Sequence, residues 1–285
     1  MWRERVMPDY LCFTAEQANS TVKLNKTWSP TAVTLETSTD WNTWNTYTFW
    51  NTITLSNVWD KVYWRNTSET DTWFNLNAWD MYKFVMTWSI AWSGDINFLL
   101  NKNSTTTLSD SCYMRLFDWC TSLTTAPRLP ATDLWTYGCY SRMFNWCTNL
   151  TIAPELPATT LIDAAYAYMF SWCTSLTTAP SLPATTLVGG SYYYMFNWCT
   201  SLETLPKLPA VQLTDYCYYF MFNWCSNIKL SSTQTWDYQT AYRIPTTWTG
   251  ITASNWGSQM FRQTWWTFTW TPSINTTYYT SNTVV

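Results

Sequence analysis

The chain has 285 residues, of which 12% are charged, and its formal net charge at pH 7 is −3. This length predicts two domains or one elongated array, and the lack of Lys and Arg clusters argues against nucleic acid as a partner. The sequence contains no histidine, so the usual general base and the commonest metal ligand are missing.

Residues 1–10 contain two arginines but no apolar run of signal-peptide length, and we interpret them as a leader or a fragment end. No run of 18 apolar residues follows anywhere in the chain, which predicts no membrane span. Thr, Ser and Asn dominate the polar positions, a composition associated with secreted or displayed β-rich proteins. We therefore expect an extracellular, cell-surface or virion location.

Residues 11–106 show short runs of alternating or β-branched residues, at 21–24, 32–37, 47–49 and 61–65. Turn-forming residues separate these runs at close spacing, which predicts an all-β module resembling a sandwich. The module is expected to act as a spacer, as a cap on the following segment, or as an attachment point.

Residues 107–230 form five repeated units. A nine-residue segment recurs at intervals of 27, 26, 26 and 26 residues, and a Pro-x-Leu-Pro step follows each of its first four copies. Within a segment the apolar residues fall at i, i+4 and i+8, as in Cys139, Met143 and Cys147, which predicts a two-turn helix. The next stretch is rich in β-branched residues and predicts a short strand, after which two prolines prevent regular pairing.

Equivalent apolar positions predict ladders of core residues running through the stacked units. The expected ladders are Tyr113, Tyr140, Tyr166, Tyr192 and Tyr218; Phe117, Phe144, Phe170, Phe196 and Phe222; Leu123, Leu150, Leu176, Leu202 and Ile228; and Cys120, Cys147, Cys173, Cys199 and Cys225. We interpret the cysteines as small buried residues. Disulfides between neighbouring units, or a metal or redox role, are the alternatives, although no close Cys pair of the kind that binds metals is present.

Residues 231–285 lose the period, but Met260–Phe261 repeats the Met–Phe pair of Met221–Phe222. We interpret this segment as a degenerate repeat and C-terminal cap. The complete prediction is an α+β protein in which a β-sandwich-like module precedes a leucine-rich-repeat solenoid of short helices and short parallel strands.

The repeated pattern M-F-x-x-C-[TS]-x-L, followed by Pro-Leu-Pro, resembles the BspA-like leucine-rich repeats of bacterial surface proteins. The resemblance covers roughly residues 107–230. It implies a solenoid with a β-lined face and a role in adhesion to host or matrix proteins. Similar arrays also occur in genes carried by bacteriophages, so the resemblance is compatible with a bacterial or a phage origin.

Tryptophan usage is abnormal, with 23 Trp against 6 Gly. Trp119, Trp146, Trp172, Trp198 and Trp224 each precede the last Cys of a segment, where a helix commonly ends at a Gly with positive φ. Trp28, Trp41, Trp59, Trp79 and the pair Trp265–Trp266 also occupy contexts typical of Gly turns. We therefore hypothesise that most Trp residues are UGA codons that the source reads as Gly. Trp44, Trp64 and Trp256 are the exceptions, in contexts that suit a genuine Trp.

The alternative interpretation is that the five stacked Trp form a platform for sugars or bases. The sparse carboxylates do not recur in register, and we interpret them as solvated surface charges. They are Asp118, Asp133, Glu155, Asp163, Glu203 and Asp215.

We predict that the chain is not an enzyme and uses no cofactor or metal. A protein or glycan partner, on another cell or in a matrix, is expected to bind the strand positions that point away from the core. These positions are Thr125, Ile152, Thr178 and Thr204, with Ser122, Asn149, Ser175 and Ser201 nearby. One alternative is a structural spacer without a ligand, and another is carbohydrate binding by an aromatic ladder. A glycan-processing enzyme, which would need two positioned carboxylates, is the least favoured alternative.

Overall fold

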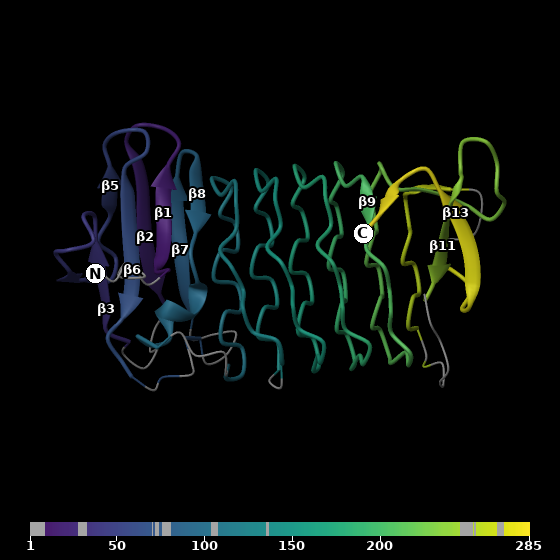
Figure 1. Ribbon diagram of the computed structural model, residues 1–285, viewed down its shortest axis with the longest axis horizontal. Helices are drawn as coiled ribbons and strands as arrows, with labels where there is room; N and C mark the ends of the chain where they lie inside the picture. The colour runs from purple at the N-terminus through teal and green to yellow at the C-terminus, as the bar shows by residue number, and fades with distance from the viewer. Residues whose placement is uncertain are drawn as a thin grey trace, which may run out of the picture.

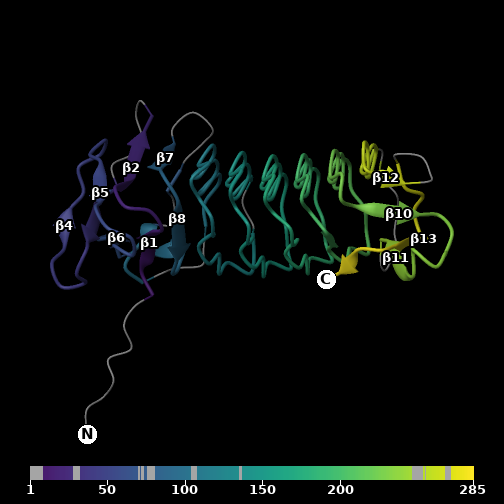
Figure 2. The same ribbon diagram turned by 90° about the horizontal axis from the view of Figure 1, so that it is seen from above.

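The computed structural model describes residues 9–27, 33–69, 71, 74–75, 81–103, 108–134, 137–245, 253, 255–266 and 271–285. The molecule is elongated, with a β module at the N-terminal end, a row of stacked units in the middle and a small sheet at the C-terminal end (Figure 1). Seen from above, the successive units again lie side by side along the long axis (Figure 2). The chain order therefore follows the length of the molecule.

The N-terminal module contains two antiparallel sheets. Their strand orders are β4-β3-β6-β1-β8 and β5-β2-β7. The strands are β1 (Leu11–Ala15), β2 (Ser20–Lys26), β3 (Leu35–Ser38), β4 (Asn45–Thr46), β5 (Ile53–Leu55), β6 (Lys61–Asn66), β7 (Tyr82–Thr87) and β8 (Ile90–Ser93), and the 3₁₀ helix η1 (Ile96–Leu99) follows.

Aromatic side chains join the two sheets of the module. Trp64 in β6 is fully buried, and its ring centroid lies 5.3 Å from that of Phe84 in β7. Phe13 in β1 lies 5.0 Å from the same Phe84 ring. Because alternate side chains of a strand point to opposite faces, these residues place the core of the module between its sheets.

The module also provides the edge on which the first repeat unit stacks. The amide of Phe84 donates to the carbonyl of Leu116 (2.9 Å), and the amide of Ile90 donates to that of Ser122 (2.9 Å). The rings of Phe84 and Phe117 are nearly parallel, with centroids 5.4 Å apart. The core of the module therefore continues into the core of the stack.

The nine-residue segments, which we expected to be helical, are strings of tight turns. In the first unit the amide of Met114 donates to Ser111 in the same unit (2.9 Å), whereas the amide of Arg115 donates to Ser141 in the next unit (3.0 Å). This alternation between bonds within a unit and bonds to the next one continues along each segment. Every fourth residue has a positive φ, namely Ser111, Arg115 and Trp119 in this unit.

The predicted α+β fold, with a leucine-rich-repeat solenoid of short helices and short parallel strands, is therefore wrong. The described residues contain no α-helix, and their strands form small, mainly antiparallel sheets. A turn every four residues returns side chains to one side of the segment with a period of four. An α-helix has a period of 3.6 residues, and nine residues are too few to separate the two patterns.

The strand expected after each turn segment is also absent from most units. The backbone there forms isolated parallel bridges, from Thr125 to Ile152 and from Ile152 to Thr178. The two-residue strand β9 (Thr204–Leu205) pairs in parallel with β14 (Thr283–Val284). The Pro-x-Leu-Pro steps explain the short pairing, since proline has no amide hydrogen to donate.

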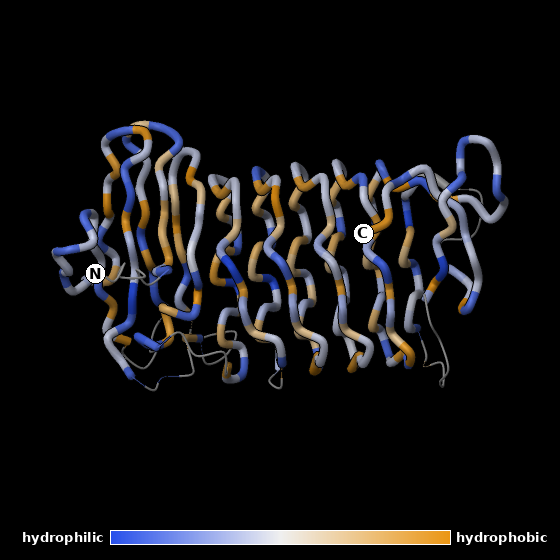
Figure 3. The backbone as a smooth tube through the Cα atoms, in the orientation of Figure 1, coloured by the Kyte–Doolittle hydropathy of each residue, from blue (hydrophilic) through white to orange (hydrophobic). Residues whose placement is uncertain are grey.

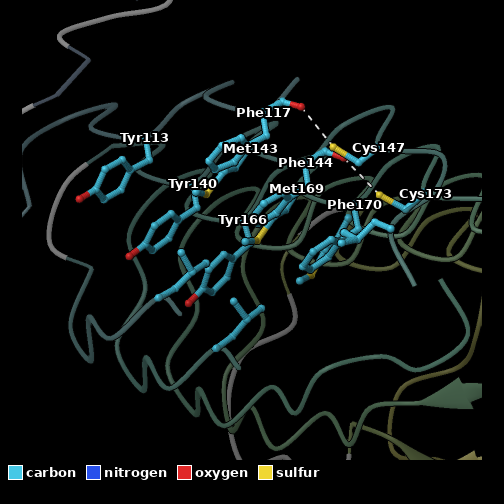
Figure 4. Close-up of a cluster of buried hydrophobic side chains, with 14 of the residues drawn as sticks. Tyr113, Phe117, Tyr140, Met143, Phe144, Cys147, Tyr166, Met169, Phe170 and Cys173 are labelled. Atoms are coloured by element: carbon cyan, nitrogen blue, oxygen red, sulfur yellow. Dashed lines mark hydrogen bonds between the residues drawn. The ribbon is translucent and has the colours of Figure 1, made fainter. Parts of the chain in front are cut away.

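Apolar segments recur at corresponding places in successive units, which is visible along the backbone in Figure 3. In the close-up of Figure 4, Tyr113, Tyr140 and Tyr166 form one row, and the neighbouring phenylalanines form a second. All five rings of each expected aromatic ladder are buried. Neighbouring tyrosine rings are 5.7–6.0 Å apart, and phenylalanine rings 5.4–5.7 Å. These rows, with the buried Leu and Ile positions, form the core of the stack.

The segment after the fifth unit continues the stack and then closes it. The amide of Phe222 donates to the carbonyl of Met260 (2.9 Å), and the Phe222 ring stacks on Phe261 at 5.3 Å. A four-stranded sheet of order β11-β13-β10-β12 lies at this end of the molecule (Figure 1). Its strands are β10 (Lys229–Ser231), β11 (Thr240–Ile244), β12 (Trp265–Trp266) and β13 (Thr276–Thr280).

Candidate functional site

The residues of the expected partner face lie along one row of the stack. Thr125, Ile152 and Thr178 are joined by parallel bridges, and Thr204 lies in β9. Ile152 is 63% exposed, whereas the hydroxyl of Thr125 donates to the carbonyl of Trp92 at 3.0 Å. The hydroxyl of Thr204 accepts a bond from the amide of Ala179 (2.6 Å). Two of the four side chains in this row are therefore committed to bonds within the protein.

The neighbouring polar residues vary in accessibility. Asn149 is exposed, while Ser122, Ser175 and Ser201 are half-buried. Ser122 Oγ lies 3.4 Å from the carbonyl oxygen of Met86, to which it donates. The row is thus uneven, and its role as a partner face stays a prediction.

A polar groove of about 420 Å³ lies beside this row, near the C-terminal strand β14. Asn282 occupies its wall: Nδ2 donates to the carbonyls of Glu203 (2.9 Å) and Asn227 (3.0 Å). Its Oδ1 accepts from the amide of Lys229 at 2.7 Å. These bonds satisfy backbone groups of two units. Asn282 therefore has a structural role in the groove, without any ligand.

The five Trp residues that precede the repeat cysteines have positive φ angles of 62–65°. Trp41 and Trp59 also have positive φ, at 68° and 73°. This is the conformation expected of a Gly turn, and a side chain with a Cβ adopts it only with strain. The glycine hypothesis therefore agrees with the backbone at these positions.

The structure corrects the glycine hypothesis at other Trp positions. Trp265–Trp266 form strand β12, so the Gly turn predicted there is wrong. Trp28 and Trp79 lie outside the described residues. Trp92, which the hypothesis grouped with the glycines, is a buried strand residue in contact with Phe84 at 5.2 Å and behaves as a genuine core aromatic.

The stacking of the repeat tryptophans argues against their use as a platform. Trp119, Trp146, Trp172, Trp198 and Trp224 stack on one another, with centroids 4.2–4.5 Å apart and interplanar angles of 6–12°. Each inner ring has both faces covered by its neighbours. A sugar or base needs a free ring face, and only the two terminal rings offer one.

The repeat cysteines are buried and bond to backbone carbonyls. The thiol of Cys147 donates to Phe117 O at 3.1 Å and that of Cys173 to Phe144 O at 3.2 Å, as the dashed lines in Figure 4 show. Cys120, Cys199 and Cys225 make equivalent bonds. All nine cysteines are free thiols. Burial raises the pKa of Cys120 to about 12, which suits a packed thiol rather than a nucleophile.

Asp118 corrects the expectation that the carboxylates of the units are solvated. Its side chain is buried, and Asn145 Nδ2 donates to its Oδ1 at 2.8 Å. Burial raises the pKa of this carboxyl, with the Asn145 bond acting in the opposite direction. Within the described part of the chain, no group of three or more His, Cys, Asp or Glu side chains is arranged to hold a metal.

A cluster of partly exposed tyrosines, not predicted from the sequence, lies on the turn side of the third to fifth units. This tyrosine surface consists of Tyr168, Tyr193, Tyr194, Tyr216 and Tyr219. A signal was present in the residues that directly follow the core tyrosine, which are Met-Arg and Ser-Arg in the first two units but include one or two aromatic residues in each of the last three.

The rings of the tyrosine surface pack against one another while keeping accessible edges. Tyr193 stacks on Tyr219 at 5.3 Å, and Tyr168 stacks on Tyr194 at 5.0 Å. Tyr216 is 43% exposed. Burial raises the pKa of Tyr193 and of Tyr194 to about 12, so both hydroxyls remain protonated donors at neutral pH.

The described residues include no helix with the length and apolar character needed to cross a membrane. Comparison of the chain with protein-family models, with curated proteins and with solved structures gives no match. The resemblance to BspA-like repeats therefore stays a prediction, and arguments about function depend on the tyrosine surface itself.

Proposed function

We propose that this chain is a non-enzymatic binding protein that recognises a glycan through its tyrosine surface. The supporting observation is the gathering of partly exposed tyrosine rings from three successive units on one side of the stack. Aromatic rings pack against the apolar C–H faces of sugars, and phenolic hydroxyls exchange hydrogen bonds with sugar hydroxyls. One surface thus provides both kinds of contact.

A spacer without a ligand would not need this surface. The Thr, Ser and Asn residues that cover other parts of the units are sufficient for solubility, whereas clustered exposed aromatics mark interaction sites. Tyr216 leaves 43% of its surface exposed, and the preceding residue, Asp215, is exposed as well. The cluster therefore favours binding over a spacer role.

The shape of the surface favours a glycan over a folded protein partner. A hollow of about 330 Å³ opens beside Tyr168 and Tyr193, a volume in the range of small-ligand sites. A stable protein interface needs about 800 Å² from each partner with a well-packed apolar centre. The tyrosine surface instead consists of five hydroxyl-bearing rings, four of which are half-buried.

Glycan-array binding by the full chain tests this proposal. We expect selective binding to a subset of glycans, and a Tyr193→Ser/Tyr219→Ser double variant should lose at least tenfold in affinity. Tyr279→Ser, a change at a half-buried tyrosine of β13 in the C-terminal sheet, is the matched control and should retain binding. Circular dichroism would verify that all three proteins are folded.

The absence of glycan binding would overturn the proposal, as would binding that the double variant retains in full. Saturable binding of a folded protein, competing with no glycan and abolished by the same double variant, would assign the surface to a protein partner instead.

A further inference from the structure

The hollow beside the tyrosine surface has two arginines in its wall. Arg115 and Arg142 line it together with Tyr168 and Tyr193. The amide of Arg115 donates to the carbonyl of Ser141 (3.0 Å), the residue before Arg142, so the two arginines lie in adjacent layers of the stack. Both occupy the second left-handed position of their unit, with φ of 58° and 57°.

The two guanidinium groups lack a close carboxylate partner. Within the described residues, no ion pair within 4.0 Å includes Arg115 or Arg142. Asp118 lies close enough to feel both charges, but it is buried and bonded to Asn145. Two like charges in neighbouring layers repel each other, and a bound anion between them would remove that repulsion.

One nitrogen of these arginines makes no hydrogen bond. Arg115 Nε is buried and has no hydrogen-bond partner. A buried polar group without a partner is costly, so the Arg115 side chain would gain bonding if a ligand drew it toward the hollow. Tyr137 also lines the hollow, and its amide donates to Oδ1 of Asp110 (3.0 Å).

One of the two arginines packs on the aromatic part of the hollow. The Arg142 guanidinium carbon lies 4.2 Å from the centroid of the Tyr168 ring, a cation–π contact. The rings of Tyr168 and Tyr193 meet edge to face, with centroids 5.3 Å apart. A planar positive group and two aromatic side chains therefore lie side by side in the wall of the hollow.

We propose that this hollow binds an acidic sugar, with its carboxylate between Arg115 and Arg142 and its ring against the accessible edges and hydroxyls of Tyr168 and Tyr193. A guanidinium donates two parallel hydrogen bonds to a carboxylate, which neither Lys nor a hydroxyl can reproduce. The inference rests on the proposed glycan-binding function and adds the chemical class of the ligand.

Titration calorimetry at 0.15 M salt with a tetramer of galacturonic acid and a tetramer of galactose tests this inference. We expect the acidic tetramer to bind at least tenfold more tightly. An Arg115→Gln/Arg142→Gln variant should lose this preference, binding the acidic tetramer no more tightly than the neutral one. Arg142→Lys, which keeps the charge but not the planar fork, should retain only part of the preference.

A Lys61→Gln/Lys207→Gln variant is the matched control, because it removes two positive charges from exposed positions elsewhere on the chain. It should keep the full preference for the acidic tetramer. Equal binding of both tetramers, or equal losses in the control and the arginine variants, would overturn the acidic-sugar assignment while leaving glycan binding intact. If neither tetramer nor any arrayed glycan binds, the proposed function itself fails.

Discussion

The indole rings of Trp146 and Trp172 are parallel, with centroids 4.2 Å apart, while both residues have a positive φ. The stacking is favourable and the backbone conformation is not. A residue with a Cβ loses about 1–2 kcal/mol in the left-handed region, whereas Gly does not.

Replacing Trp172 by Gly and by Ala separates these two effects. Both changes remove the stacked ring, but only Gly relieves the backbone, so Trp172→Gly should be more stable than Trp172→Ala by about 1 kcal/mol. Urea denaturation measures the difference. At Ser175, which is outside the positive-φ set, the same comparison should favour Ala or give no difference. An Ala variant at position 172 as stable as the Gly variant would show that the turn carries no strain.

The glycine hypothesis predicts the composition of the protein made by its native source. Mass spectrometry should find Gly at positions 119, 146, 172, 198 and 224, and Trp at the buried positions 64 and 92, with UGA at the former codons and UGG at the latter. Detection of Trp at 119, 146 and 172 in native material would end the hypothesis.

Alkaline pH should destabilise the protein steeply because its thiols are buried. Burial raises the pKa of Cys120 from its ordinary value of 9.0 to about 12. Above pH 9 the Cys120 thiol loses its proton in the unfolded chain but keeps it in the folded protein. The stability of the folded protein is therefore unaffected by this thiol below pH 9 and falls as the pH rises from 9 toward 12. Each such thiol lowers the free energy of unfolding by about 1.4 kcal/mol per pH unit in that window.

Urea denaturation at pH 7, 8, 9 and 10 measures this dependence. Cys120→Ala should show a fall between pH 9 and 10 that is smaller by about 1 kcal/mol than that of the parent chain, because the unfolded thiol is only half ionised at pH 9. A free energy of unfolding that is unchanged between pH 8 and 10 would contradict the burial of the thiols.

The C-terminal strand should depend strongly on Asn282. Asn282→Ala leaves the carbonyls of Glu203 and Asn227 and the amide of Lys229 without their side-chain partner, which should cost about 1–3 kcal/mol. Hydrogen exchange should then accelerate in β13 and β14. Asn149→Ala, at an exposed asparagine of the stack, is the control and should change little. Equal exchange in both variants would argue against a stabilising role for the Asn282 hydrogen bonds.

The sequence allows part of the fold and little of the site to be predicted. The 26-residue interval between Phe144 and Phe170 is visible because each unit repeats the same apolar spacing. The local conformation is not visible, since nine residues such as 139–147 fit a period of four as well as a period of 3.6. The positive φ at the repeat Trp positions could be anticipated because each Trp lies near the end of its apolar segment, directly before the last Cys, where the chain is expected to turn.

The tyrosine surface escaped prediction for a different reason. Tyr192 and Tyr193 are adjacent and chemically identical, yet the first is buried in the core and the second lines a hollow. Which side each ring takes depends on the turn geometry, which the helical assignment misplaced. Arg115 and Arg142 become neighbours only through hydrogen bonding between units, so a linear inspection treats them as unrelated charges.

The alternating hydrogen bonds of the turn segments give every unit the same two edges, one that donates to its successor and one that accepts from its predecessor. Such edges would accept another molecule's unit as readily as the chain's own, and copies could join end to end into a fibre. Strands β7 and β8 occupy the first edge, while Trp256–Arg262 and the C-terminal sheet occupy the last. The terminal segments, rather than the repeats, therefore prevent end-to-end association of the stacks.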